Sequence, residues 1–466
     1  MELMKSLSLK NPSCLFFLFG LAWVTLNVFF LPFHPWTTGI VRPWFMLNGY
    51  LPYRDFGWMR TPLDLFLLSF WYRLFGISAQ AYQFFVFTLI TIITLILFLT
   101  KKAFSFTFYL LLLFPLFLNI EEGEIFIGLF SLLFFVLMCQ YFQNKKLSWL
   151  LTSGLIAGLA LITKQNSALM ILAGLLALGL DVKRLSVFIV RAGLYFLAAL
   201  LPFILLSGYF INHASFKDFF DSTIIFPLFT YSKAPVTHGD GGWIAAGYLS
   251  LLIPFILFRK KTGFSTQSAI LLVLLILVLF ASLLPSFLSY RAFTAFPLVA
   301  IVAGTNVALF LKNKTSRLII SISFLFFLGF IARFLGDYCS FVRDNGFHFQ
   351  QYLLDYGETE YKIAAWLRKN TQKEEKIINY GNAIIYLLAN RLPKNRYIDP
   401  FPYGLQPYEK TSQVFFDNLP RIVVYDESLP ADHLGLEEWP FIKFMKENYH
   451  QAARFGETLV IYEYLD

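Results

Sequence analysis

The sequence predicts a polytopic α-helical membrane protein with about eleven transmembrane helices and a small α/β domain after them. Of the 466 residues, 57% are hydrophobic and 14% are charged, whereas soluble proteins carry roughly 25% charged residues. Runs such as residues 269–284 are apolar all round, and a helix is the element that satisfies its own backbone hydrogen bonds in lipid. They also lack the polar–apolar alternation of membrane β-strands. This composition excludes a soluble enzyme, a disordered chain and a fibrous repeat.

Eleven apolar segments follow one another along the chain. The first comes after Lys5 and Lys10 and has no small-residue cleavage site behind it, so we interpret it as an uncleaved helix. Those at 147–163 and 167–180 are shorter than the roughly 20 residues of a straight span, and they form either two spans or one re-entrant hairpin. The segments are 13–33, 80–100, 103–118, 125–143, 147–163, 167–180, 185–211, 243–258, 265–287, 292–311 and 316–336.

The connecting loops fall into two alternating sets that differ in charge. One set is short and holds 14 Lys and Arg, with only Glu2 and Asp181 as acids. Short basic loops stay in the cytoplasm, so we expect a multi-pass plasma (inner) membrane protein with a cytoplasmic N-terminus and an extracytoplasmic tail. The basic residues of this set are Lys5, Lys10, Lys101, Lys102, Lys145, Lys146, Lys183, Arg184, Arg259, Lys260, Lys261, Lys312, Lys314 and Arg317.

The net charge of +9 is unevenly distributed. Residues 1–336 carry 24 Lys and Arg against 10 Asp and Glu, and residues 337–466 carry 14 against 19. The basic excess therefore belongs to the membrane part, which favours topology signals and contacts with membrane lipids or phosphate over nucleic-acid binding. We divide the chain into a transmembrane domain at 1–336, with a long first outer loop at 34–79, and an extracytoplasmic α/β domain at 337–466.

Both outer regions show secondary-structure patterns. In the first outer loop, Pro62–Phe75 has an amphipathic helical pattern that ends at Gly76 and is too short to span, so we expect it to lie in the membrane interface. In the tail, helices are expected at 361–370, 383–390 and 440–448, and strands at 376–380, 421–425 and 459–464. This alternation predicts a mainly parallel sheet. The tail has no phosphate loop, metal-ligand spacing or nucleophile motif, so we interpret it as structural or acceptor-facing.

Asp55 is the first candidate catalytic residue. It stands beside Arg54 and near Arg60 in the first outer loop. A carboxylate next to two guanidinium groups can serve as a general base near an anionic substrate, although the same residues can form a simple interfacial salt bridge. Asp64 is its closest rival, but we expect Asp64 to face solvent from the interfacial helix.

An acidic cluster is the second candidate site. Glu121, Glu122 and Glu124 follow the third apolar segment at its outer end. Carboxylate oxygens suit a divalent metal such as Mg²⁺ or Mn²⁺. Alternatively, they form a solvated cap where the helix dipole favours negative charge.

Two further cations lie at the outer ends of apolar segments. Lys164 stands between two short segments, and Arg291 begins a later helix. Charged groups at membrane depth are costly and usually functional, and either cation can hold a lipid phosphate. The alternative for each is a long side chain that reaches the interface.

Three motifs resemble the GT-C glycosyltransferases, in particular bacterial relatives of the dolichyl-phosphate-mannose protein mannosyltransferase and aminoarabinose transferase group. Asn48–Phe56 (NGYLPYRDF) with Arg60-Thr-Pro-Leu63 resembles their first outer loop, and Gly158–Asn166 (GLALITKQN) resembles their Gly-x-x-x-x-x-Lys-Gln element. Tyr290-Arg291 with Pro297 is similar to one of their late helices. The tail resembles their outer C-terminal domains, through its first helix and the run that ends at Gly381.

The resemblance implies inverting transfer of a sugar from a polyprenyl-phosphate donor to an unknown acceptor on the extracytoplasmic face. It implies that an outer-loop carboxylate activates the acceptor, and that Arg54, Arg60, Lys164 and Arg291 help to hold the donor phosphate. Relatives often carry an acidic residue early in the first outer loop, where this chain has His34–Gly39 (HPWTTG). Either Asp55 then acts as the base, or the 121–124 cluster contributes to it, or the protein is catalytically altered. A lipid transporter or flippase and a non-catalytic envelope scaffold remain the alternative functions.

Overall fold

The computed structural model describes residues 12–30, 37–100, 122–182, 184–229, 241–281, 289–312, 314–346, 358–396, 398, 415–417, 419–428 and 440–464. The chain forms two compact units. The first comprises residues 1–34, 78–208 and 236–353, and the second comprises 35–77, 209–235 and 354–466. The first outer loop and the tail therefore contribute to the same unit.

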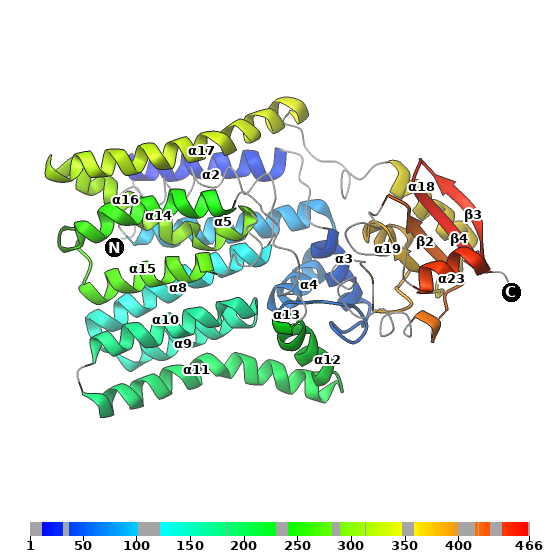
Figure 1. Cartoon of the computed structure of the whole chain (residues 1–466), viewed down its shortest axis with the longest axis horizontal. Helices are drawn as coiled ribbons and strands as arrows, with labels where there is room; N and C mark the ends of the chain where they lie inside the picture. Colours follow the sequence, from blue (N-terminus) through cyan, green and yellow to red (C-terminus); the bar gives the residue numbers. More distant parts are fainter. Residues whose placement is uncertain are drawn as a thin grey trace. The chain divides into compact units, whose positions relative to one another are not determined.

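The first unit is a bundle of helices, several of which lie side by side (Figure 1). Each apolar segment of the sequence that the structure describes forms a helix. The helices are α2 (Pro12–Phe30), α5 (Ala79–Leu99), α8 (Glu122–Asn144), α9 (Leu147–Leu161), α10 (Ala168–Asp181), α11 (Leu185–Asn212), α14 (Gly241–Leu257), α15 (Thr266–Ala281), α16 (Phe296–Lys312) and α17 (Arg317–Asn345). Short 3-10 turns link them at Gln165–Ser167, Arg259–Lys261, Ser289–Ala295 and Lys314–Ser316.

Among the described residues, 4 helices are long and apolar enough to cross a membrane: Ala79–Leu99, Glu122–Asn144, Leu185–Asn212 and Phe293–Lys312. Five shorter apolar helices accompany them. The expected segment at 103–118 lies outside the described residues. The count of eleven spans thus stays a prediction. The domain boundary after residue 336 also stays a prediction, and this position lies inside α17.

Two glycines determine how closely α9 packs on α11. A Cβ on Gly154 would lie 2.6 Å from the Tyr195 carbonyl oxygen, and one on Gly158 would lie 2.2 Å from that of Ala199. Both contacts are with backbone, which cannot move aside as a side chain can. The four-residue spacing of these glycines is the small-residue pattern through which membrane helices approach closely. Gly158 of the sequence motif therefore has a packing role.

The second unit contains the first outer loop. Its helices here are α3 (Thr37–Leu47) and α4 (Leu63–Phe75). The predicted helix at 62–75 is confirmed and ends at Gly76, whose φ of +76° favours glycine. The same unit also contains α12 (Phe216–Phe220), a π-turn at Asp221–Ile225 and α13 (Phe226–Phe229).

The tail forms a four-stranded sheet in the order β1-β2-β4-β3 (Figure 1). Its elements are α18 (Glu358–Asn370), β1 (Ile378–Tyr380), α19 (Ile384–Ala389), β2 (Ile422–Asp426), α23 (Pro440–Asn448), β3 (Tyr449–Phe455) and β4 (Leu459–Tyr464). Apolar side chains of β1 and β2, such as Tyr380 and Val423, pack with Phe441 and Met445 of α23 into one core.

The prediction of a mainly parallel sheet is wrong. Among the described strands, the β1–β2 pair is parallel, whereas β2–β4 and β3–β4 are antiparallel. The cause is strand β3, which the apolar pattern did not reveal, because its His450, Gln451 and Arg454 are polar and exposed. A tight turn at Gly456 joins β3 to β4, and so short a connection can link only antiparallel neighbours. The other tail helices and strands form where they were predicted.

Candidate functional site

A tight loop in the second unit carries Asp55. Tyr53 adopts a φ of +72°, which is uncommon for a bulky residue. Its amide donates to the Phe56 carbonyl at 2.7 Å, and its buried hydroxyl donates to the Arg60 carbonyl at 2.6 Å. The ring packs edge-on against Phe210 and Phe219. These contacts stabilise the unusual backbone conformation of Tyr53, and they thereby fix the position of Arg54 and Asp55, which follow it.

The Asp55 carboxylate accepts three hydrogen bonds. Arg54 donates from Nε to Oδ1 at 2.9 Å and from Nη2 to Oδ2 at 2.7 Å, and the Leu51 amide donates to Oδ2 at 2.8 Å. The Asp55 side chain is 25% exposed. Because a carboxylate has about four acceptor positions, one lone pair on Oδ1 remains for a further donor. The ion pair in turn raises the pKa of Arg54.

The Trp58 ring contacts two arginines, Arg42 of α3 and Arg60. The Arg42 guanidinium lies 4.5 Å from the centre of its ring, and that of Arg60 lies 5.6 Å from it. Cations at such distances are attracted by the ring face. The structure therefore places Arg60 beside an aromatic ring, together with Arg42, which was not among the predicted site residues.

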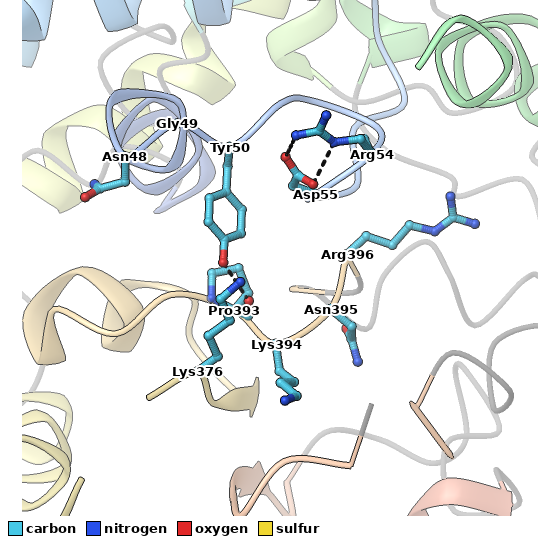
Figure 2. Close-up of a pocket in the computed structure, with 10 residues that line it drawn as sticks. All are labelled: Asn48, Gly49, Tyr50, Arg54, Asp55, Lys376, Pro393, Lys394, Asn395 and Arg396. Atoms are coloured by element: carbon cyan, nitrogen blue, oxygen red, sulfur yellow. Dashed lines mark hydrogen bonds and ion pairs between the residues drawn. The ribbon is translucent and has the colours of Figure 1, made fainter. Parts of the chain in front are cut away.

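An open pocket of about 530 Å³ lies beside Asp55. Figure 2 shows the Arg54–Asp55 pair on one side and residues of the tail on the other, with Tyr50 between them. The Tyr50 hydroxyl donates to the Pro393 carbonyl at 3.1 Å. The lining residues are Asn48, Gly49, Tyr50, Arg54, Asp55, Lys376, Pro393, Lys394, Asn395 and Arg396.

The tail side of this pocket is basic. The Lys376 ammonium lies 5.2 Å from the centre of the Tyr50 ring, and Arg396 forms an ion pair with Asp218 at 3.0 Å. No sequence motif singled out Lys376, Lys394 and Arg396, although the run Pro393-Lys-Asn-Arg396 concentrates two cations just after a predicted helix. Only the fold shows that this run meets the loop of Asp55.

Asp64 is buried, so the expectation that it faces solvent is wrong. It is 1% exposed and occupies the second position of α4. Residues four apart share one face of a helix, and Asp64 shares its face with the buried Leu68 and Tyr72. Of the two rival carboxylates, Asp55 is the one that solvent and a substrate can reach.

The first unit contains the other predicted site residues. Lys164 forms a buried ion pair with Glu124, whose side chain is 0% exposed. Tyr82 donates from its hydroxyl to Glu122 Oε2 at 2.5 Å. Arg291 is partly buried in the turn before α16, and its carbonyl accepts from the Thr294 hydroxyl at 3.1 Å. Glu121 lies outside the described residues.

Of the acidic cluster, the described residues Glu122 and Glu124 do not share a site for a divalent metal. Glu122 and Glu124 have separate partners, Tyr82 and Lys164. No group of three or more potential ligands occurs among the His, Cys, Asp and Glu side chains that the structure describes. A metal at Glu124 would first have to displace an ammonium group from a buried carboxylate.

The predicted residues therefore fall into two sets. Arg54, Asp55 and Arg60 belong to the second unit, and Glu122, Glu124, Lys164 and Arg291 belong to the first. In the second unit Asp55 forms an ion pair with Arg54, and in the first unit Lys164 forms one with Glu124. The catalytic and phosphate-binding roles of both sets stay predictions.

Comparison with solved structures identifies the fold. The chain is similar to ArnT from Cupriavidus metallidurans, solved with undecaprenyl phosphate, with a TM-score of 0.57, 12% identity, and coverage of 96% of this chain and 97% of ArnT. It is also similar to the oligosaccharyltransferase of Archaeoglobus fulgidus, solved with a tethered acceptor peptide, with a TM-score of 0.53, 11% identity, and coverage of 99% and 75%. The archaeal oligosaccharyltransferase AglB from Archaeoglobus fulgidus, solved with an inhibitory peptide and a dolichol-phosphate, matches with a TM-score of 0.50, 12% identity, and coverage of 98% of this chain and 74% of that chain.

These neighbours are GT-C membrane glycosyltransferases. No model of a known protein family matches the chain. No curated protein sequence matches it either. The structure thus confirms the predicted resemblance at the level of the fold, which extends over nearly the whole chain.

Proposed function

We propose that this protein transfers a sugar from a polyprenyl-phosphate donor to an acceptor hydroxyl on the extracytoplasmic face of the membrane. The observation that carries the proposal is the match to ArnT along 96% of this chain and 97% of that one, because ArnT was solved with undecaprenyl phosphate bound. A shared fold alone hosts many functions. The reachable carboxylate of Asp55 supplies the second, local argument.

Asp55 is the proposed general base. As the acceptor oxygen forms its bond to the anomeric carbon, its proton moves to Asp55 Oδ1, and the bond from that carbon to the phosphate oxygen breaks. The phosphate leaves with the electron pair, and the displacement inverts the anomeric centre. Positioned proton transfer of this kind typically accelerates a reaction by about 10²–10⁴-fold. Arg54 binds both carboxylate oxygens of Asp55 and so orients the free lone pair of Oδ1.

The donor phosphate is assigned to the basic side chains that the sequence motifs contain. Arg60, beside Trp58 at 5.6 Å, and Arg291 retain the role that their positions in the sequence suggest. Arg54 has one guanidinium nitrogen, Nη1, that does not bind Asp55. Lys164 is compensated by Glu124, so it acts on a phosphate as a net cation only when that ion pair opens.

The extracytoplasmic location of the tail is proposed from the set of short basic loops. A reporter fused after residue 466 should be active on the extracytoplasmic side. Activity in the cytoplasm would contradict the topology and the placement of the site together.

Transfer of a radiolabelled sugar tests the function. The purified full chain, in vesicles with a labelled polyprenyl-phosphate hexose, should release the label into an acceptor fraction from a membrane extract. Movement of the labelled lipid between leaflets without sugar transfer would instead identify a flippase. Neither transfer nor movement, in a folded protein, would favour the scaffold.

A further inference from the structure

The pocket beside Asp55 has two positive charges that nothing in the described part of the chain neutralises. Four cationic side chains and one carboxylate line it. Arg54 is neutralised by Asp55, and Arg396 is neutralised by Asp218. Among the described residues, Lys376 and Lys394 pair with no carboxylate, and both are exposed. The lysines therefore give this side of the pocket its charge.

The backbone holds both lysines in place. The Lys394 amide donates to the Ile377 carbonyl at 2.9 Å, and the Ile377 amide donates to the Leu392 carbonyl at 3.1 Å. These bonds tie the segment of Lys394 to that of Lys376. The Tyr50 ring beside Lys376 is itself anchored through its hydroxyl to the Pro393 carbonyl. Side chains on a fixed backbone lose less freedom when they bind a ligand.

These features match a small acidic ligand. A phosphate monoester carries about −1.5 to −2 charges at pH 7, close to the two uncompensated ammonium groups. Lysine binds phosphate as a point charge and needs no fixed planar geometry. A volume of about 530 Å³ falls within the roughly 300–1,000 Å³ of small-molecule sites.

We propose that this pocket binds an acceptor saccharide that carries a phosphate or carboxylate group. Lys376 and Lys394 hold the acidic group on one side, and an acceptor hydroxyl reaches Asp55 Oδ1 on the other side (Figure 2). This inference rests on the proposed function, because it names the class of acceptor for the same transfer.

Binding to the purified full chain tests the proposal without catalysis. Glucose 6-phosphate is the probe, titrated in low salt, with glucose and inorganic phosphate as comparisons. We expect glucose 6-phosphate to bind more tightly than either one, and high salt to weaken it. Replacement of Lys376 or Lys394 by Ala should weaken binding about tenfold each, as expected for one charge-assisted hydrogen bond.

The matched control replaces Lys369 and Lys373 by Ala. Both are exposed lysines of the same unit and do not line the pocket, so the affinity should not change. Equal binding of glucose, equal binding of inorganic phosphate, no binding of the probe, or an unchanged affinity in the Lys376→Ala/Lys394→Ala variant would each contradict the proposal.

The two proposals fail in different assays. If the protein transfers sugar, but the double variant keeps wild-type affinity and turnover, the acidic acceptor is wrong and the transferase stands. If the probe binds through the lysines, but no sugar transfer occurs, the pocket stands and the proposed function is wrong.

Discussion

Each unit contains one ion pair built from predicted site residues, and the two pairs lie in opposite surroundings. Lys164 and Glu124 are 11% and 0% exposed, within a bundle of apolar helices. Arg54 and Asp55 are 44% and 25% exposed, at the edge of an open pocket. The buried pair has lost its water, whereas the exposed pair still has much of it. The first is therefore suited to hold helices together, and the second is suited to meet a substrate.

The comparison shows why a charged residue in an apolar sequence is not by itself a binding residue. Both pairs look alike as sequence features, and both were candidate sites. Removing one partner of a buried ion pair leaves an unpaired charge in a low-dielectric interior. Removing one partner of an exposed pair leaves a charge that water solvates. Four substitutions test this difference, in order of expected effect.

Replacement of Lys164 by Met should have the largest effect. It leaves the Glu124 carboxylate buried and uncompensated, which costs about 3–5 kcal/mol of the free energy of unfolding. Thermal unfolding in detergent measures the loss. The control is Lys362→Met, which breaks an exposed ion pair with Glu358 on α18 and should change stability by less than about 0.5 kcal/mol.

A second variant isolates the ion pair. Lys164→Met combined with Glu124→Gln removes both charges, so it should be more stable than Lys164→Met alone. If the double variant loses as much as the two single variants together, the pair does not stabilise the bundle.

Replacement of Asp55 by Asn should have the next largest effect, on turnover. It keeps the shape of the side chain but removes the proton acceptor, so sugar transfer should fall by at least about a hundredfold, which is about 2.7 kcal/mol. Donor binding and thermal stability should change little. Normal turnover in this variant, with loss of activity in Glu122→Gln or Glu124→Gln, would move the base to the first unit.

Replacement of Gly158 by Ala tests the packing around the buried pair. The new methyl group meets the Ala199 carbonyl oxygen and Pro202 on α11. Such overpacking should lower the free energy of unfolding by about 1–3 kcal/mol. Gly193→Ala on α11 is the control, because a Cβ there has nothing within 4 Å. Equal stability of the two variants would show that α9 and α11 can separate without cost.

Replacement of Arg54 by Ala should have the smallest effect on stability. Its side chain is 44% exposed, and exposed ion pairs contribute about 0–1 kcal/mol. Thermal unfolding should therefore stay near that of the wild type, in contrast to Lys164→Met. A loss comparable to that of Lys164→Met would mean that the loop of Asp55 depends on this pair for its fold.

The sequence by itself determined the elements. Helices form at the apolar segments that the structure describes, because a fully apolar stretch of this length has few other stable conformations in lipid. The helix at 63–75 and most of the tail helices and strands also form as predicted, since their patterns of apolar residues match one buried face. The resemblance to GT-C proteins, read from short motifs, was enough to predict the fold.

The tertiary structure decided which side chains meet. The sequence placed Asp64 in solvent, but the face of α4 that it shares with Leu68 and Tyr72 is buried. It separated Lys164 from Glu124 into two candidate sites, although packing pairs them. It gave no reason to link Lys376 and Lys394 to Asp55, more than 300 residues earlier. The periodicity of apolar residues determines which segments form helices or strands. The partner of a charged side chain depends on which segments pack against it in the fold, and periodicity carries no information about that packing.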